Sequence, residues 1–184
     1  MTGDAGGSGM PITGVFLVSI DAHPDDRGSF SEIYRREWIR DGPEMVQANL
    51  SVSRPGVLRG LHFHREQSDY WLLLSGVEFV GLYDLRRGSP SEGRKLEILL
   101  DLEEGPRRGL FIPPGVAHGF FAKTEVELLY LVDRYFTGED EHGIAWNDAD
   151  VGIEWPSRNP ILSDRDRANP SLGEIRQSAP EYRG

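Results

Sequence analysis

Histidine and aspartate side chains are the groups in this chain whose types and spacing could do chemistry. His62 and His64 lie two positions apart in a strand-like run, so both should point to one face of that strand. With Asp69 and His118 they form a possible ligand set for iron, manganese, nickel or zinc. His62 could instead act as a base, since the unperturbed pKa of histidine is about 6.5. A histidine facing a barrel interior can also be an ordinary hydrogen-bonded core residue, and the residue types alone leave all three interpretations open.

Short apolar runs punctuated by Gly, Pro, Asp and Asn predict the strands that would position these groups. Many short strands at close spacing favour a sandwich or barrel, so we expect an all-β fold. Short peripheral helices are predicted at Arg35–Asp41 and at Leu162–Ala168, the second with Ser163 as its N-cap. The predicted strands are Val15–Ile20, Gly28–Tyr34, Val57–His64, Trp71–Leu74, Glu78–Leu85, Leu96–Leu102, Gly109–Ile112, Gly119–Ala122 and Glu127–Val132.

Composition excludes several classes of function. The net charge of −10, from 30 acidic and 20 basic residues, argues against a broad nucleic-acid or membrane surface. It still allows a few arginines to bind a small anionic ligand. With no cysteine, the chain can form neither disulfides nor thiolate metal sites. No apolar run approaches the roughly 20 residues of a membrane-spanning helix.

The chain reads as one domain with two short tails. Residues 1–10 lack the basic and apolar regions of a signal peptide, so we expect a disordered leader or cloning remnant and a cytoplasmic protein. Met10 could be the native start. Residues 11–172 should form a single domain, because no linker or internal repeat divides them. The polar segment 173–184 is expected to pack loosely.

Several motifs resemble, in order, those of the dTDP-4-dehydrorhamnose 3,5-epimerase family. The resemblance runs from about Val15 to Leu172 and is highly specific because so many motifs follow one another in order. The matching segments are Asp26-Arg27-Gly28, Gln47-Ala48-Asn49, Val57-Leu58-Arg59-Gly60-Leu61-His62-Phe63, Asp84-Leu85-Arg86-Arg87-Gly88-Ser89-Pro90, Ile112-Pro113-Pro114-Gly115-Val116-Ala117-His118-Gly119-Phe120, Trp146-Asn147-Asp148, Gly152-Ile153-Glu154-Trp155-Pro156 and Leu162-Ser163-Asp164-Arg165-Asp166.

That resemblance implies a cupin-type jelly-roll barrel, usually a homodimer whose subunits lend strands to each other. It also implies epimerisation of a nucleotide-diphosphate-4-keto-6-deoxy-sugar at the carbons beside the ketone, without an added cofactor. By resemblance His62 is the base that forms the enolate, Asp166 orients its ring and stabilises the imidazolium, and Tyr130 is the acid on the opposite face. His62 and Asp166 are 104 residues apart in sequence, so only the folded chain could join them.

Substrate-binding roles follow from the same resemblance. Arg27 and Arg59 match positions that bind the diphosphate, a task that suits guanidinium groups. Strand alternation conflicts with this for Arg59, since it should point away from the face shared by His62 and His64. Tyr135 could stack on the nucleotide base, although packing explains it equally well. The residues assigned to substrate binding are Arg27, Glu32, Arg59, Gln47, Asn49, His118 and Tyr135.

Two positions depart from the family pattern. Asp69 occupies the place of a lysine thought to steady the enolate oxygen, and a carboxylate would oppose that charge. His64 replaces a common glutamine. With Gly56 and Gly76, these changes resemble the metal-binding motif of other cupins, with His118 as a third histidine. The alternative is therefore a metal-dependent cupin isomerase or oxygenase that uses His62, His64, Asp69 and His118 and a divalent ion. A sugar-nucleotide sensor without turnover is a third interpretation.

Overall fold

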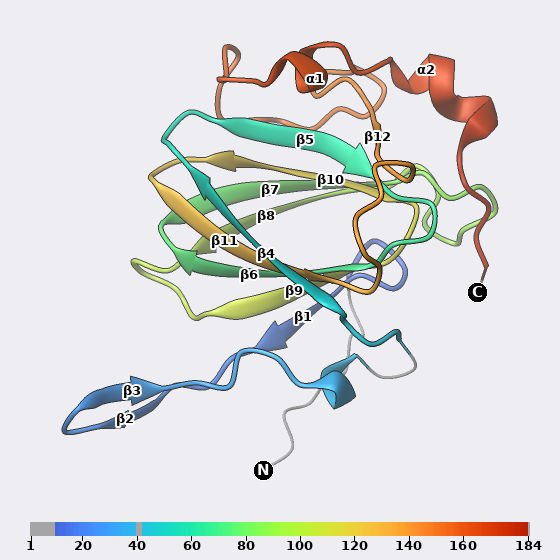
Figure 1. Cartoon of the computed structure of the whole chain (residues 1–184). Coiled ribbons are helices and arrows are strands. Elements are labelled where there is room, and N and C mark those ends of the chain that lie inside the picture. Colours follow the sequence, from blue (N-terminus) through green and yellow to red (C-terminus); the bar gives the residue numbers. More distant parts are fainter. Residues whose placement is uncertain (1–9, 40–41, 184) are drawn as a thin grey trace.

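Two five-stranded sheets face each other in the computed structural model, which describes residues 10–39 and 42–183 (Figure 1). The strands pair antiparallel within each sheet, which confirms the predicted all-β jelly-roll class. The first sheet contains, in spatial order, β1 (Phe16–Ser19), β9 (Arg108–Ile112), β6 (Asp69–Ser75), β11 (Val126–Val132) and β4 (Gln47–Ser53). The second contains β12 (His142–Gly143), β5 (Leu58–Phe63), β10 (Val116–Ala122), β7 (Val77–Asp84) and β8 (Lys95–Asp101). A separate hairpin pairs β2 (His23–Asp25) with β3 (Gly28–Phe30).

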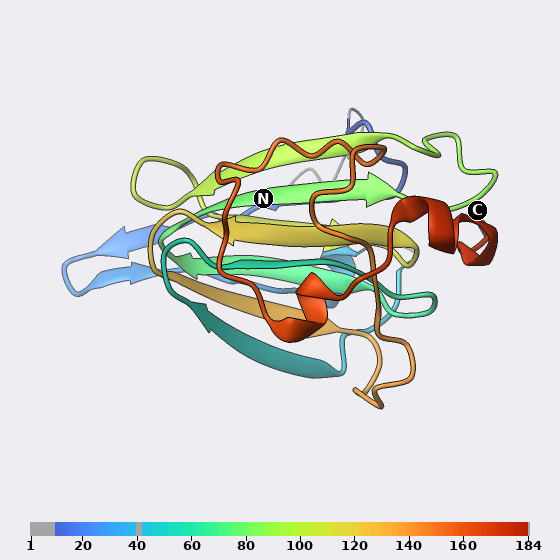
Figure 2. The same cartoon turned by 90° about the horizontal axis from the view of Figure 1, so that it is seen from above.

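Apolar side chains are buried in three layers rather than one. The central layer lies between the sheets and includes Trp71 and Leu110 from the first sheet and Val80 and Phe120 from the second. The N-terminal segment covers the outer face of the first sheet, and the segment after β12 covers the outer face of the second (Figure 2). Strands buried on both faces read as continuous apolar runs. For this reason runs such as β6 and β10 show little alternation between apolar and polar residues.

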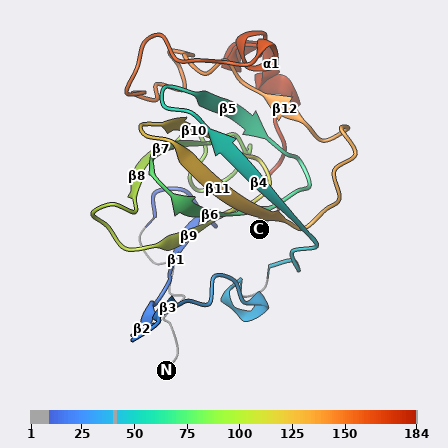
Figure 3. The same cartoon turned by 60° about the vertical axis from the view of Figure 1, so that its left-hand side comes forward.

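The short helices lie at the edges of the barrel. Ser163 caps α1 (Asp164–Arg167) as predicted, since its hydroxyl accepts a hydrogen bond from the Asp166 backbone N–H. The N-terminal helix is shorter than predicted: η1 (Arg36–Trp38) is a single 3₁₀ turn. The prediction of β3 was also too long, because the strand ends at Phe30 instead of Tyr34. Its hairpin extends away from the barrel (Figure 3).

Strand β4 was absent from the sequence-based prediction. Its sequence contains Asn and Ser and has no continuous apolar run, although every second residue is more exposed. It forms one edge of the first sheet and pairs only with β11 among the described strands. Exposed Leu50 and Val52 lie on this edge strand.

The two ends of the chain were predicted to be loose. The predicted leader, residues 1–10, lies outside the described residues except for Met10. The segment 173–184 begins within α2 (Leu172–Ile175) and continues through η2 (Arg176–Ser178). Arg87 forms backbone hydrogen bonds with Pro180 and Tyr182, and Ala179 is buried. No helix in the described part of the chain is long and apolar enough to cross a membrane.

Candidate active site

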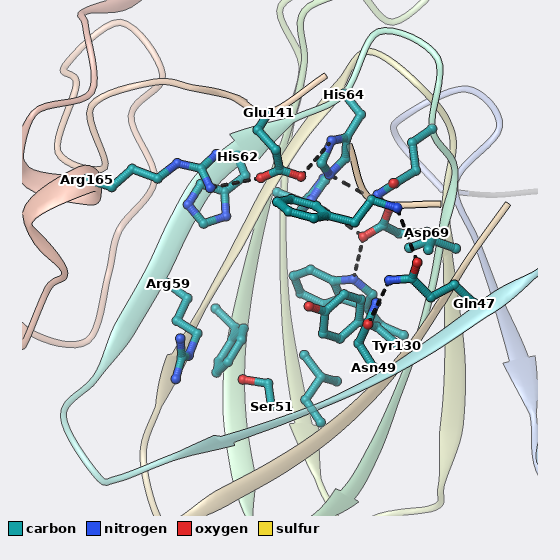
Figure 4. Close-up of a pocket in the computed structure, with 17 residues that line it drawn as sticks. Gln47, Asn49, Ser51, Arg59, His62, His64, Asp69, Tyr130, Glu141 and Arg165 are labelled. Atoms are coloured by element: carbon teal, nitrogen blue, oxygen red, sulfur yellow. Dashed lines mark hydrogen bonds and ion pairs between the residues drawn. The ribbon is translucent and has the colours of Figure 1, made fainter. Parts of the chain in front are cut away.

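A pocket of about 430 Å³ opens between the two sheets (Figure 4). Strands β4, β6 and β11 of the first sheet form one wall, and β5 and β10 of the second form the other. Its volume falls within the usual range for small-molecule sites. Polar and charged side chains gather in it: Gln47, Asn49, Ser51, Arg59, His62, His64, Gln67, Asp69, His118, Tyr130, Glu141 and Arg165.

An irregularity in β5 brings Arg59 to the pocket. His118 of β10 pairs with His62, but Phe120 pairs with Arg59, so three steps along β5 face two along β10. The intervening Gly60 has a φ of +131°, and a Cβ there would lie 2.7 Å from the Cα of Gly119. Such a bulge resets the alternation of side chains. The expectation that Arg59 points away from the face of His62 was therefore wrong.

His62 and Asp166 form a hydrogen-bonded pair, which we call the dyad. His62 Nε2 lies 2.6 Å from Asp166 Oδ1, and the exposed fractions of the side chains are 24% and 5%. Burial opposes ionisation of Asp166, but the hydrogen bond and charge of His62, with the Ser163 hydroxyl, hold the pKa of the carboxyl below its ordinary value. The carboxylate thus fixes the ring, and Nδ1 has no hydrogen-bond partner among the described residues.

His64, Asp69 and His118 form a second group, which we call the cluster. All three are buried, and one potential ligand atom from each lies within 4.8 Å of the others. Burial lowers the pKa of His118 well below its ordinary value, so its ring is neutral. Of the four residues in the alternative ligand set, these three gather and His62 does not join them; α1 brings the Asp166 carboxylate to His62 Nε2 instead.

Tyr130 lies on the wall opposite the dyad. It belongs to β11, whereas His62 belongs to β5 of the facing sheet. Burial raises the pKa of the Tyr130 phenol, so it stays protonated at neutral pH and can donate a proton. Gln47 and Asn49 line the same wall on β4, where the Gln47 amide donates to Asn49 Oδ1 at 2.9 Å.

Three predicted binding residues lie away from this pocket. Arg27 sits at the tip of the β2–β3 hairpin with 89% of its side chain exposed and pairs with Asp25. Glu32 is also exposed and pairs with Arg35. Tyr135 is 71% exposed and lines a neighbouring surface hollow. Within one chain, these three side chains are not brought together with the dyad.

Sequence reasoning missed several pocket residues, among them Gln67, Trp71, Glu141 and Arg165. Gln67 and Trp71 flank Asp69, and strand alternation from Asp69 could have identified Trp71. Arg165 adjoins Asp166 and forms an ion pair with Glu141 at 2.8 Å. Glu141 carries no local signal, because the loop after β11 places it here through tertiary contacts alone. Together, the pocket offers a carboxylate-bound base, a neutral phenol opposite, and the guanidinium groups of Arg59 and Arg165 for an anionic ligand.

Comparisons with known proteins show which proteins the sequence and fold are similar to. The sequence profile of the dTDP-4-dehydrorhamnose 3,5-epimerase family matches residues 9–174. The dTDP-4-dehydrorhamnose 3,5-epimerase of Streptomyces griseus is 35% identical over 184 residues, covering 94% of this chain and 90% of the relative. The Mycobacterium tuberculosis rmlC epimerase superposes with a TM-score of 0.87 at 34% identity, covering 95% and 92% of the two chains. ChmJ, a 3′-monoepimerase of Streptomyces bikiniensis solved with dTDP-quinovose, gives 0.85 at 30% identity, covering 94% and 92%. These neighbours confirm the cupin type of the jelly roll.

Proposed function

Since the chain belongs to the dTDP-4-dehydrorhamnose 3,5-epimerase family, we propose that it epimerises a nucleotide-diphosphate-4-keto-6-deoxy-sugar at carbon 3, carbon 5 or both. The protein is then an isomerase. The observation that carries this proposal is the dyad at the pocket wall, with His62 Nε2 held 2.6 Å from Asp166.

The proposed reaction is proton transfer on both faces of the sugar ring. Neutral His62 donates Nε2–H to Asp166, which leaves the lone pair of Nδ1 to take the proton from the carbon beside the ketone. The electron pair of the broken C–H bond moves to the ketone oxygen and forms an enolate. Tyr130 returns a proton to the same carbon from the opposite face, which inverts its configuration. Two walls from two sheets suit this geometry, because the base and the acid must flank the substrate.

No redox cofactor is needed, because the substrate and product have the same oxidation state. The diphosphate requires positive charge, and Arg59 supplies a guanidinium group at the pocket. Gln47, Asn49 and His118 supply neutral polar groups for the sugar or nucleotide. The cytoplasmic location expected from the sequence stays a prediction.

Assembly into a homodimer would explain the residues that lie outside the pocket. The hairpin that carries Arg27 extends from the barrel, and Phe30 on it is 67% exposed. The edge strand β4 exposes Leu50 and Val52 by 60% and 52%. Exposed apolar side chains on an unpaired edge indicate an interaction surface. A second copy of the chain could cover them while each hairpin brings Arg27 and Glu32 to the partner's pocket.

The central test is substrate-dependent exchange of ring hydrogens in heavy water. With a dTDP-4-keto-6-deoxy-hexose, NMR should show deuterium entering at one or both carbons beside the ketone. His62→Asn should reduce that exchange by about 10²–10⁴-fold, the usual contribution of general base catalysis. His142→Asn is the matched control, since His142 lies on the neighbouring strand β12 and outside the pocket. Undiminished exchange in His62→Asn would overturn the assignment.

Mixing two inactive variants tests the exchange of hairpins. Arg27→Ala lacks the cation, and His62→Asn lacks the base. If Arg27 acts in the partner's pocket, the mixed dimer contains one complete site, and an equimolar mixture should regain about a quarter of the native activity. No recovery after subunit exchange, verified by mass spectrometry of the mixed dimer, would contradict this arrangement.

A further inference from the structure

The cluster holds two imidazole nitrogens that face a carboxylate without bonding to it. His64 Nε2 lies 4.0 Å from Asp69 Oδ1, and His118 Nε2 lies 3.8 Å from Asp69 Oδ2. Both distances exceed those of a hydrogen bond. We propose that His64, Asp69 and His118 bind a divalent transition-metal ion at the inner end of the pocket.

The orientation of the two rings supports this proposal. His64 Nδ1 lies 2.6 Å from the backbone carbonyl oxygen of Asp140, and His118 Nδ1 lies 3.0 Å from that of Val116. A carbonyl only accepts, so in each neutral ring Nδ1 carries the hydrogen and Nε2 presents its lone pair. Histidines that ligate metals are usually fixed in this way, with the second nitrogen donating to a carbonyl or carboxylate.

The carboxylate between the rings is oriented as well. Trp71 Nε1 donates to Asp69 Oδ2 at 3.1 Å, and the Gln67 amide donates to Oδ1 at 2.9 Å. Each oxygen keeps a further lone pair for an ion. Bonds of about 2.0–2.2 Å would place ligand atoms roughly 3.4 Å apart in a tetrahedral site. The two separations from Asp69 are 3.8 and 4.0 Å and all three ligand atoms lie within 4.8 Å of one another, so the side chains must draw closer together to hold an ion.

A set of two imidazole ligands and one carboxylate ligand limits which metal ions the site would bind. This donor set suits zinc or iron(II), and sites with three protein ligands leave positions open for water or substrate. Here all three ligands line the pocket, so an open position would face the substrate. His62 lies outside the set of groups whose ligand atoms all lie within 4.8 Å of one another, and Asp166 holds its Nε2. The base and the metal site can therefore coexist. From the sequence alone they competed, because both interpretations used His62.

A role in catalysis follows only if the proposed epimerisation is correct. The carboxylate of Asp69 by itself would repel the negative charge that develops on the ketone oxygen. A divalent cation would reverse the sign of the charge at this end of the pocket and polarise the ketone. The residues of the cluster would then position the cation, while His62 and Tyr130 move the protons.

Metal binding by the full, untagged chain tests the inference without substrate. Protein purified without chelator is assayed for metals, stripped, and titrated with Zn²⁺ by calorimetry and with Co²⁺ by visible absorption. We expect one ion per chain. His64→Ala, His118→Ala and Asp69→Asn should each weaken binding by at least about 10–100-fold, the loss that an outer partner of a ligand causes alone. His142→Ala and His62→Asn should bind like the native chain.

Several outcomes would overturn the inference. These are a native chain that binds neither Zn²⁺ nor Co²⁺ stoichiometrically, cluster variants that bind as tightly as native, or His142→Ala losing as much affinity as they do. Near-UV circular dichroism checks that each variant is folded, and Asp69→Glu should retain binding because it keeps the carboxylate. The proposed epimerisation fails separately, since exchange in heavy water is measured on its own. If the chain binds metal but catalyses no exchange, the metal site is supported and its proposed role in catalysis is wrong.

Discussion

The dyad and the cluster each set histidine beside buried aspartate in the same pocket, yet the two regions differ in which ring nitrogen is bonded. In the dyad a carboxylate holds Nε2 of His62, so Nδ1 is left over. In the cluster, backbone carbonyls hold Nδ1 of His64 and His118, so Nε2 is left over and faces Asp69. A carboxylate partner raises the basicity of a ring, whereas a carbonyl mainly fixes its tautomer. The same residue types therefore suit a base in one region and metal ligands in the other.

Asp166→Asn would break the dyad side of this comparison with the largest effect. The amide can keep the shape but cannot stabilise the imidazolium, so we expect proton exchange to fall by about 10²–10⁴-fold. Metal binding should be unchanged, because the cluster does not contact Asp166. Exchange rates and Zn²⁺ calorimetry on the same preparation measure both. Loss of metal affinity in this variant would show that the two regions are not independent.

Tyr130→Phe tests whether the facing wall works with the dyad. Without the phenol the opposite-face proton must come from water, so we expect product formation to fall by about 10²-fold. Exchange at the carbon that His62 deprotonates should fall less, since the step in which His62 removes the proton is intact. Deuterium incorporation and epimer yield, followed together by NMR, separate the two steps. Equal losses in both would place Tyr130 in binding rather than in reprotonation.

Glu78 sharpens the comparison by showing a buried carboxylate with no partner. It lies on β7, and neither of its oxygens has a hydrogen-bond partner among the described residues. Burial raises its pKa to about 8 from an ordinary 4.5. The unfolded chain thus loses this proton at lower pH than the folded chain, so the free energy of unfolding should decrease as pH rises from 4.5 through 8.

Glu78→Gln should remove that slope. The stability gain over the native chain should be larger at pH 9 than at pH 5 by about 4 kcal/mol, at about 1.4 kcal/mol for each pH unit between pH 5 and the folded pKa of about 8. Urea unfolding at both pH values measures it, with Glu127→Gln as the control because Glu127 is an exposed residue of β11. An equal gain at both pH values would mean that Glu78 has a partner, as the acids of the dyad and the cluster do.

Trp71→Phe tests the cluster and is the substitution with the smallest expected effect. Phenylalanine keeps the aromatic packing but removes the indole N–H that orients Asp69. We expect the affinity for Zn²⁺ to fall by about tenfold, with exchange of the metal-loaded protein affected less than in Asp166→Asn. Trp155→Phe is the matched control, because its N–H bonds the Trp146 carbonyl outside the pocket. Unchanged Zn²⁺ affinity would mean that this hydrogen bond does not tune the site.

Local sequence signals predicted those parts of the fold and site that depend on neighbouring residues. The apolar runs predicted most strands, and Ser163 predicted the start of α1, because a hydroxyl there satisfies a free backbone N–H. Ordered motifs identified the family and selected His62, Asp166 and Tyr130 as candidates. The polar strand β4 and the pocket residue Glu141 were missed because their placement depends on partners distant in the chain.

By itself the sequence determined an acidic, cysteine-free, all-β chain of the epimerase family with a changed pair, His64 and Asp69. Only the tertiary structure decided that Arg59 faces the pocket, since a bulge at Gly60 cancels the alternation of an ideal strand. It also decided which histidine belongs to which aspartate. Residues 62 and 166 meet because α1 packs beside β5, and no pattern along the chain encodes that distance.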